Sequence, residues 1–233
     1  KPFTIGLRRL DLATWIEVDD QLAAYLQEKR RLYAGEWANV FGAEDGTEDA
    51  QREVLTLLAD DLPVNHAAQY VRTGNSMRIL DGAFTVDLAS AGMPPLALAG
   101  LMVQEDLVLM RKSAEGWRLV AASLCFPSAW SLREKLGKPM HAVHAPVPGF
   151  TEGTRNANLI ERMFDALQVA QPVMRWNWTL FGETRLYHPA GGVGLKKHFG
   201  GDGIEGPITL RLERQTLRKL PASSDILVTI RTH

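Results

Sequence analysis

Five short apolar segments between residues 77 and 124 limit most strongly what this chain of 233 residues can fold into. They are rich in strand-forming residues and span residues 77–80, 83–88, 96–103, 107–111 and 117–124. Turn-forming pairs separate them, namely Asp81-Gly82, Pro94-Pro95 and Glu115-Gly116. Parallel strands need a crossover of about a dozen residues, so strands joined by such short turns must be antiparallel. The pattern predicts a small antiparallel sheet, with a hairpin at Glu115-Gly116.

The first seventy residues have a different, helical periodicity. Apolar side chains recur at helical spacing across residues 18–33, with charged residues between them. A second helix is predicted from Glu48, after an N-cap at Gly46-Thr47, until Pro63 ends it. These two segments predict a helical N-terminal layer over residues 1–72.

Further helices and strands follow the first sheet segments. Ser131 and Glu134 form a capping box for a short helix, and another helix is predicted to begin near Thr154. Further strands are predicted at residues 173–181, 208–217 and 226–232. We therefore expect one α+β domain over residues 1–233, an antiparallel sheet with flanking helices and a helical N-terminal extension.

A glycine-rich loop over residues 190–206 is predicted to be a mobile lid. It contains neither the Gly-Lys-[Ser/Thr] ending of a Walker loop nor a GxGxxG motif that opens a helix, so no nucleotide site is expected there.

The composition is that of an ordinary globular protein, with 45% apolar and 23% charged residues. A formal net charge of −1 gives no electrostatic reason to expect nucleic acid or an anionic membrane as a partner. No apolar run approaches the roughly 20 residues of a membrane-spanning helix, and the first residues lack the pattern of a secretory signal. A single cysteine fits a reducing compartment, so we expect a cytoplasmic protein.

The segment from Cys125 to Phe150 concentrates the residues that could bind a ligand. It holds the only cysteine, two of the six histidines and four of the twelve prolines. Prolines after His144 restrict its backbone, so this histidine could be a haem or metal ligand, a general base, or a residue that bonds only its own loop. His141 lies three residues earlier, but without a third ligand in the sequence no zinc site is expected. Cys125 ends an apolar segment and could be a thiolate ligand, a nucleophile or a small buried side chain.

Two of the predicted strands also carry candidate residues. Trp176 and Trp178 would share one face of the first, where they could line an aromatic pocket for a cationic amine or belong to the core, and Asn177 would face the opposite side. In the second, Leu210, Leu212, Arg214 and Thr216 would share one face, and Arg211, Glu213 and Gln215 the other. Its arginines could bind a propionate or a phosphate, or the segment could be a solvated edge strand.

Several of these stretches resemble one family, the haem-dependent oxidative N-demethylase alpha-subunit family, formerly a domain of unknown function. The matching stretches span nearly the whole chain in family order and read FTIGLRRLD, CFPSAWSLREKLGKPMHAVHAPVPGF, RWNWTL and LRLERQTLRKLPASSDILVTIRTH. The resemblance implies a PAS-like haem domain that binds haem b.

The resemblance also implies an activity and its partners. The activity is that of a monooxygenase: O₂-dependent demethylation of a small secondary amine such as dimethylamine, with release of formaldehyde. Electrons would come from NADPH through a separate reductase subunit that carries FMN and a 2Fe-2S centre, and a tetrahydrofolate-binding subunit could take up the formaldehyde. The alternative function is a haem-binding PAS-like sensor, or a haem-free binding module without turnover.

The resemblance finally suggests roles for single residues. His144 corresponds to the histidine of the family's His-Ala-Pro-Val-Pro-Gly block and is expected to be the proximal haem ligand, with Cys125 as the alternative. The expected propionate ligands are Arg214, Arg211 and Arg231. The expected residues of the distal, catalytic pocket are Trp176, Asn177, Trp178 and Glu213.

Overall fold

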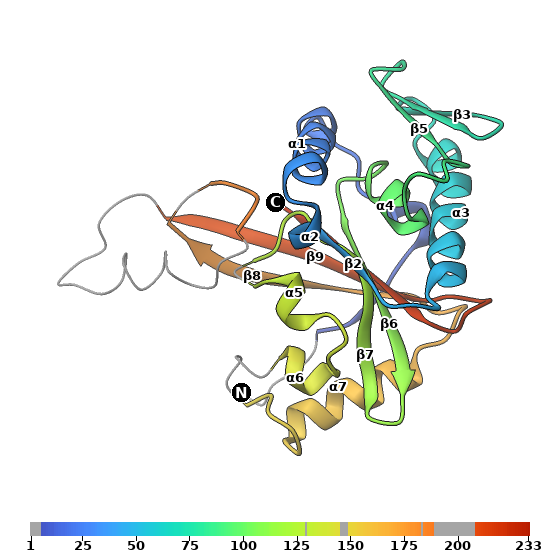
Figure 1. The fold of residues 1–233 in the computed structure, drawn as a ribbon. Coiled ribbons are helices and arrows are strands. Elements are labelled where there is room, and N and C mark those ends of the chain that lie inside the picture. Colours follow the sequence, from blue (N-terminus) through green and yellow to red (C-terminus); the bar gives the residue numbers. More distant parts are fainter. Residues whose placement is uncertain (1–5, 129, 145–148, 183, 189–207) are drawn as a thin grey trace.

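The computed structural model describes residues 6–128, 130–144, 149–182, 184–188 and 208–233 (Figure 1). The described part combines helices with antiparallel strands, so the predicted α+β class is confirmed. The glycine-rich loop over residues 190–206 and the prolines after His144 lie outside the described residues.

The helices lie in two parts of the chain, residues 12–100 and residues 132–166. They are η1 (Leu12–Thr14), α1 (Leu22–Gly35), α2 (Trp37–Val40), α3 (Glu48–Asn65), α4 (Pro95–Gly100), α5 (Leu132–Lys135), α6 (Met140–Val143) and α7 (Arg155–Ala166). None of the described helices has both the length and the apolar character that crossing a membrane requires.

The strands form two antiparallel sheets in the described part of the chain. The larger has the order β1-β8-β9-β10-β6-β7-β2, in which the strands are β1 (Arg8–Arg9), β2 (Phe41–Ala43), β6 (Asp106–Ser113), β7 (Gly116–Ser123), β8 (Val173–Phe181), β9 (Thr209–Lys219) and β10 (Ile226–Thr232). The smaller consists of β3 (Tyr70–Thr73), β4 (Ser76–Ile79) and β5 (Phe84–Asp87), and it stands beyond one end of α3 in Figure 1.

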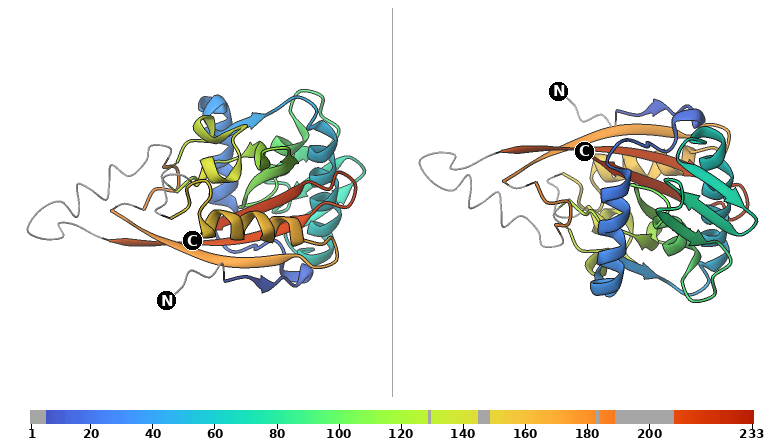
Figure 2. Two further views of the ribbon diagram at one scale, coloured as in Figure 1. Left: turned by 90° about the horizontal axis from the view of Figure 1, so that it is seen from below. Right: turned by 90° about the horizontal axis from the view of Figure 1, so that it is seen from above.

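Each face of the large sheet packs against its own hydrophobic cluster. In the view from below α7 lies in front of the strands, whereas in the view from above α1 does (Figure 2). The cluster on the α1 side includes Leu26, Leu107 and Cys125, and we call this the N-terminal face. The cluster on the α7 side includes Phe164 and Leu217, and we call this the α7 face. Side chains alternate between the faces along each strand, so neighbouring residues enter different clusters.

Local sequence signals explain where several elements begin and turn. The predicted hairpin at Glu115-Gly116 joins β6 to β7, and Gly116 has a φ of +100° that favours glycine. A Cβ at this position would lie 2.9 Å from a carboxylate oxygen of Glu161, so the turn also needs a residue without a side chain. Thr154 caps α7 as predicted, because its hydroxyl accepts the backbone N–H of Ala157 at 3.3 Å.

Several sequence predictions about these elements are wrong. The segments at residues 77–80 and 83–88 belong to the small sheet and not to the sheet that contains the Glu115-Gly116 hairpin. Ser131 stands at the N-cap of α5, but its side chain makes no capping hydrogen bond.

Residues 96–103 were predicted as a strand, but residues 96–100 belong to helix α4. This helix has Pro95 in its first turn and is buried from Leu96 to Gly100. A short segment that is apolar on all sides can be a buried helix as well as a buried strand, and periodicity does not separate the two. Pro63 does not end α3, which continues to Asn65, because a proline this close to the end disturbs only the last turn.

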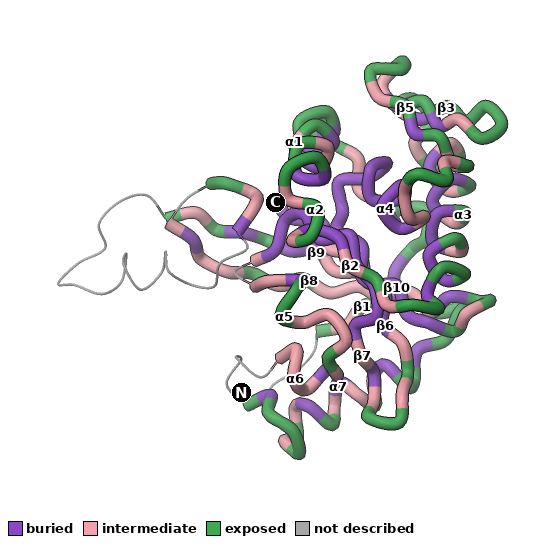
Figure 3. The backbone as a smooth tube through the Cα atoms, viewed as in Figure 1, coloured by how far each residue is buried: buried purple, intermediate pink, exposed green. Residues whose placement is uncertain are grey.

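Burial is concentrated at the centre of the large sheet. Figure 3 shows buried backbone along β6, β7 and α4, with exposed segments on the outer sides of α1 and α3 and on the small sheet. The strands β8 and β9 project from this centre in Figure 1, and their residues therefore range from buried to exposed.

Candidate functional site: a cavity on the α7 face

A cavity of about 580 Å³ lies on the α7 face of the large sheet. Strands β6 to β10 contribute lining residues, as do helices α5, α6 and α7, and the volume is in the range usual for ligand sites. Most of its wall is apolar, with Phe164 and Ile160 from α7 and Val228 and Ile230 from β10. The polar and charged lining residues are Ser128, Glu134, Lys135, His144, Arg175, Asn177, Thr179, Glu213 and Gln215. The cavity is thus an apolar space with a few charged groups.

Strand pairing explains the row of polar side chains along β8 and β9. Asn177 pairs with Glu213 and Arg175 pairs with Gln215 in an antiparallel register. Paired residues direct their side chains to the same face, and residues two apart along a strand do the same. The four side chains therefore form one polar surface at the cavity, as the alternation in the sequence predicted for Asn177 relative to Trp176 and Trp178.

The carboxylate of Glu213 is buried and accepts hydrogen bonds from three neutral groups. The Ser128 hydroxyl donates to one oxygen, while the amides of Gln215 and Asn177 donate to the other at 2.8 Å and 3.4 Å. These donors orient the carboxylate but do not neutralise its charge. Glu213 thus gives the cavity a fixed negative group.

His144 follows the last turn of α6 and lines the same cavity. Its Nδ1 lies 3.0 Å from the carbonyl oxygen of Met140, and because a carbonyl can only accept, Nδ1 must carry the proton. Burial lowers the pKa of His144, and the nearby cations Lys135 and Arg175 lower it further. The ring is therefore neutral near pH 7, with its lone pair on Nε2, as an imidazole that binds a metal requires.

Two cations in the cavity were not among the candidate residues of the sequence analysis. Burial lowers the pKa of the Arg175 guanidinium, and its Nε has no hydrogen-bond partner among the described residues. Burial also lowers the pKa of Lys135, whose Nζ lies 4.5 Å from the centre of the Trp130 ring. Arg175 could have been found from the sequence, because it lies two residues from Asn177 and so on the same strand face. Nothing in the sequence singles out Lys135.

Arg214 and Arg231, predicted propionate ligands, lie on the other face of the sheet. The Arg214 guanidinium donates to the carbonyls of Trp15 and Thr14 at 2.9 Å and 2.6 Å, and it pairs with Glu17 at 3.3 Å. The two arginines therefore anchor the N-terminal layer and do not line the cavity.

Arg231 makes comparable contacts. It pairs with Asp19 at 2.6 Å, and its guanidinium carbon lies 4.3 Å from the centre of the Tyr25 ring. The prediction placed both arginines near a ligand because residue type alone does not show which face of the sheet meets the cavity.

Arg211 lies two residues before Glu213 on β9, so its side chain leaves the strand on the same side as Glu213 and on the opposite side from Arg214. Its guanidinium, however, donates to the backbone carbonyls of Phe126 and of Leu186, and lies 5.4 Å from the centre of the Phe181 ring. It is not one of the residues that line the cavity. Arg211 therefore supports the segments beside the site. The structure does not bring it together with His144 in the cavity, where it was expected to contact the ligand.

Cys125, the alternative iron ligand, is fully buried in the hydrophobic cluster of the N-terminal face. Its backbone N–H donates to Asp106 at 2.7 Å, and burial raises the pKa of its thiol well above the ordinary value. Cys125 does not line the cavity, so the structure does not bring it together with His144. Here the interpretation of a small buried side chain matches the structure.

Trp176 and Trp178 share a strand face as predicted, but it is the face turned away from the cavity. Their side chains are 46% and 64% exposed, so they are neither core residues nor the lining of an aromatic pocket with Asn177. The ring of Trp176 lies 5.8 Å from that of His233.

The interpretation of β9 as an edge strand is also wrong, because β8 and β10 flank it.

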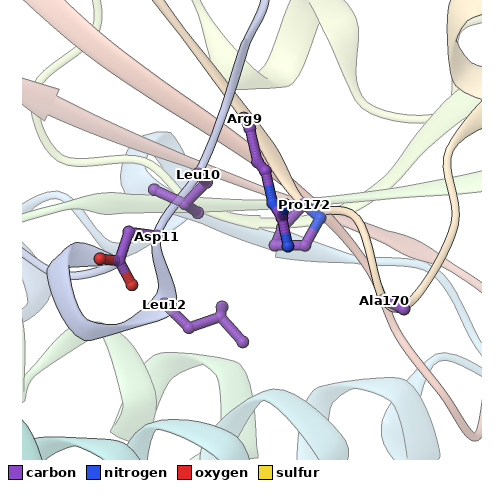
Figure 4. Close-up of a pocket in the computed structure, with 6 residues that line it drawn as sticks. All are labelled: Arg9, Leu10, Asp11, Leu12, Ala170 and Pro172. Atoms are coloured by element: carbon purple, nitrogen blue, oxygen red, sulfur yellow. The ribbon is translucent and has the colours of Figure 1, made fainter.

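Other possible sites carry less chemistry. The Nε2 atom of His141 lies 3.9 Å from the Glu152 carboxylate, outside the cavity. In the described ranges no group of three or more His, Cys, Asp or Glu side chains could hold a metal ion. A second hollow of about 490 Å³ is lined by Arg9, Leu10, Asp11, Leu12, Ala170 and Pro172 (Figure 4). Its one carboxylate, that of Asp11, caps η1, which leaves no paired groups for catalysis.

The fold and the cavity define a class of protein: an α+β domain whose sheet and helices enclose a largely apolar site with one neutral histidine and a few charges. A sequence profile described as haem-dependent oxidative N-demethylase, alpha subunit-like, matches residues 6–233. The chain belongs to this family, which was expected from its motifs.

Proposed function

We propose that this chain is the haem-binding catalytic subunit of an oxidative N-demethylase that acts on a small secondary amine. One observation carries the proposal: His144, with Nδ1 anchored by Met140, lines a cavity that also contains the buried carboxylate of Glu213. The family assignment supports a haem-dependent oxidoreductase, and the cavity provides a ligand for the iron together with a group that can bind an amine.

The cavity residues fit a haem by their chemistry. His144 would be the axial ligand through Nε2, because its Nδ1–H bond to Met140 fixes the tautomer and the orientation of the ring. Phe164, Ile160 and Ile230 would pack against the porphyrin and exclude water. The buried Nε of Arg175 has no hydrogen-bond partner in the described part, as expected where an anionic ligand is to bind. When bound, haem b would supply the redox chemistry that activates O₂.

Glu213 and Asn177 would hold the amine. A secondary amine enters as a cation at neutral pH, and the Glu213 carboxylate would accept its N–H. Ser128 and Gln215 would keep the carboxylate oxygens in place while the substrate binds. We leave Trp176 and Trp178 out of the proposed substrate site, because they are exposed on the other side of β8.

The remaining parts of the proposal follow the family resemblance. The designation alpha subunit implies further subunits, and we propose that one of them is an NADPH-dependent reductase with FMN and a 2Fe-2S centre. We further propose dimethylamine-like substrates, formaldehyde as the product, a tetrahydrofolate-binding subunit as its acceptor and a cytoplasmic location. The antiparallel sheet flanked by helices supports a PAS-like fold.

The first test is the absorption spectrum of the purified protein with added haem, in the ferric and the ferrous–CO form. The wild type should show a Soret band, and His144→Ala should shift or lose it. His141→Ala is the matched control, because His141 is a neighbouring histidine outside the cavity and should leave the band unchanged. The absence of a Soret band in the wild type would sink the proposal and leave a haem-free binding module.

The second test is turnover. With a suitable reductase and NADPH, the haem-loaded protein should consume O₂ only when a secondary amine is present and should release formaldehyde. Glu213→Gln should raise KM for the amine by about tenfold or more, because it removes the charge that binds the substrate. Haem binding without any amine-dependent O₂ consumption would favour the sensor.

A further inference from the structure

Arg175 and Lys135 reach the cavity from different elements, one from the sheet and one from a helix. Arg175 belongs to β8 and Lys135 to the last turn of α5, and both line the cavity with His144. The two cations therefore share one cavity with the proposed axial ligand.

Neither cation has the partners that a structural buried charge normally has. Arg175 and Lys135 form none of the ion pairs found among the described residues. The Nε of Arg175 is buried and has no hydrogen-bond partner in the same set of residues. Both cations are half-buried, and Lys135 has only the Trp130 ring beside it, so two cations without an ion pair in one cavity point to an anionic ligand.

The nearby carboxylates do not remove this need. Glu213 raises the pKa of Arg175 through its charge, but its oxygens accept hydrogen bonds from Ser128, Asn177 and Gln215. Glu134, next to Lys135 in the chain, is exposed and therefore screened by water. Both cations remain available to a ligand that enters the cavity.

We propose that Arg175 and Lys135 bind the two propionates of the haem and so decide which edge of the porphyrin faces α5 and β8. This inference rests on the proposed function and replaces the earlier expectation for Arg214 and Arg231. A guanidinium binds a carboxylate through two donors, and a lysine ammonium acts as a point charge, so the pair suits a ligand with two separate carboxylates.

The test compares haem with haem dimethyl ester, whose propionates are neutral, in a titration followed by the Soret band and by tryptophan fluorescence. The wild type should bind haem at least about tenfold more tightly than the ester. Arg175→Gln and Lys135→Gln should each weaken haem binding about tenfold and leave ester binding nearly unchanged. Arg162→Gln and Lys138→Gln, which replace exposed cations outside the cavity, are the matched controls and should behave as the wild type.

Each outcome separates the inference from the proposed function. Variants that bind haem as tightly as the wild type would overturn the inference and leave the proposed function standing. Variants that lose haem and ester equally would also overturn it, because they would show a structural role. Selective loss of haem affinity without amine turnover in the wild type would support the inference and refute the demethylase. A wild type that binds neither porphyrin would refute both.

Discussion

The two faces of the large sheet use the same residue types in opposite ways. On the N-terminal face, Arg214 and Arg231 each pair with a carboxylate near the start of the chain, those of Glu17 and Asp19, and Arg214 also donates to two backbone carbonyls. On the α7 face, Arg175 is half-buried and forms none of the ion pairs found within the described ranges. One face thus uses its charges to hold the protein together, and the other keeps its charges for a ligand.

This difference shows how to recognise a binding site on a sheet that is buried on both sides. Burial alone does not distinguish the faces, because both carry charged side chains under helices. The useful criterion is whether a carboxylate of the protein itself pairs with the buried cation. Stability should therefore depend on the charges of the N-terminal face, and ligand binding on those of the α7 face.

The largest expected effect is on stability, from Arg214→Ala. The substitution leaves the buried carbonyl of Trp15, the carbonyl of Thr14 and the partner carboxylate of Glu17 without their donor, and should cost about 3–5 kcal/mol. Arg175→Ala should cost less than about 1 kcal/mol, because no described group depends on its Nε. Urea denaturation of both variants without haem measures the contrast. Equal losses would break the comparison between the faces.

The second effect is a pH dependence that arises at the buried Asp106 of β6. Burial raises the pKa of Asp106 from 3.8 to about 6, although Lys29, Arg211 and the N–H groups of Cys125 and Phe126 oppose the shift. The folded pKa lies above the unfolded one, so the ionised carboxylate costs stability above pH 6, and this cost disappears as the pH falls towards 4. Between pH 7 and pH 4 this group should add about 2 kcal/mol to the free energy of unfolding.

Asp106→Asn isolates this contribution from those of other groups. The variant should be less stable at each pH, because an amide has only one acceptor oxygen for the two N–H groups of Cys125 and Phe126. Its unfolding free energy should lack the increase between pH 7 and pH 4 that is specific to Asp106. The same pH profile in both proteins would show that Asp106 has an ordinary pKa.

The smallest effect is expected for Cys125→Ala. The substitution removes one buried sulfur atom from a packed cluster, and should cost about 1 kcal/mol of stability. It should leave the Soret band and the ferrous–CO spectrum of the haem-loaded protein unchanged, since Cys125 is outside the cavity. A changed spectrum would move the iron ligand to the N-terminal face and would contradict both the comparison and the role of His144.

Much of the fold follows from the pattern of the sequence. Residues 173–181 and 226–232 were predicted as strands with the bounds that β8 and β10 have, and the β6–β7 hairpin lies at Glu115-Gly116. These segments have strong period-two patterns and explicit turn signals, so local preference and tertiary structure agree. Helix α4 was missed because its few residues are apolar on all sides and have no period to detect.

The candidate site was predictable only in part. His144 was singled out from its proline-rich loop, and Asn177 and Glu213 were named with the family resemblance; all three line the cavity. Arg214 was also singled out, yet it contacts the N-terminal layer, while Arg175 was overlooked. The sequence by itself determined which residues share a strand face, because alternation along a strand is a local property.

Only the tertiary structure decided which of these faces meets the cavity. Strand order places β9 between β8 and β10, and the packing of α5 to α7 on one side makes that side the binding face. The same packing brings Lys135 of a short helix and Arg175 of a strand to one cavity, although 40 positions separate them in the chain. Contacts between distant segments depend on how the layers stack, and no local pattern of residues encodes that.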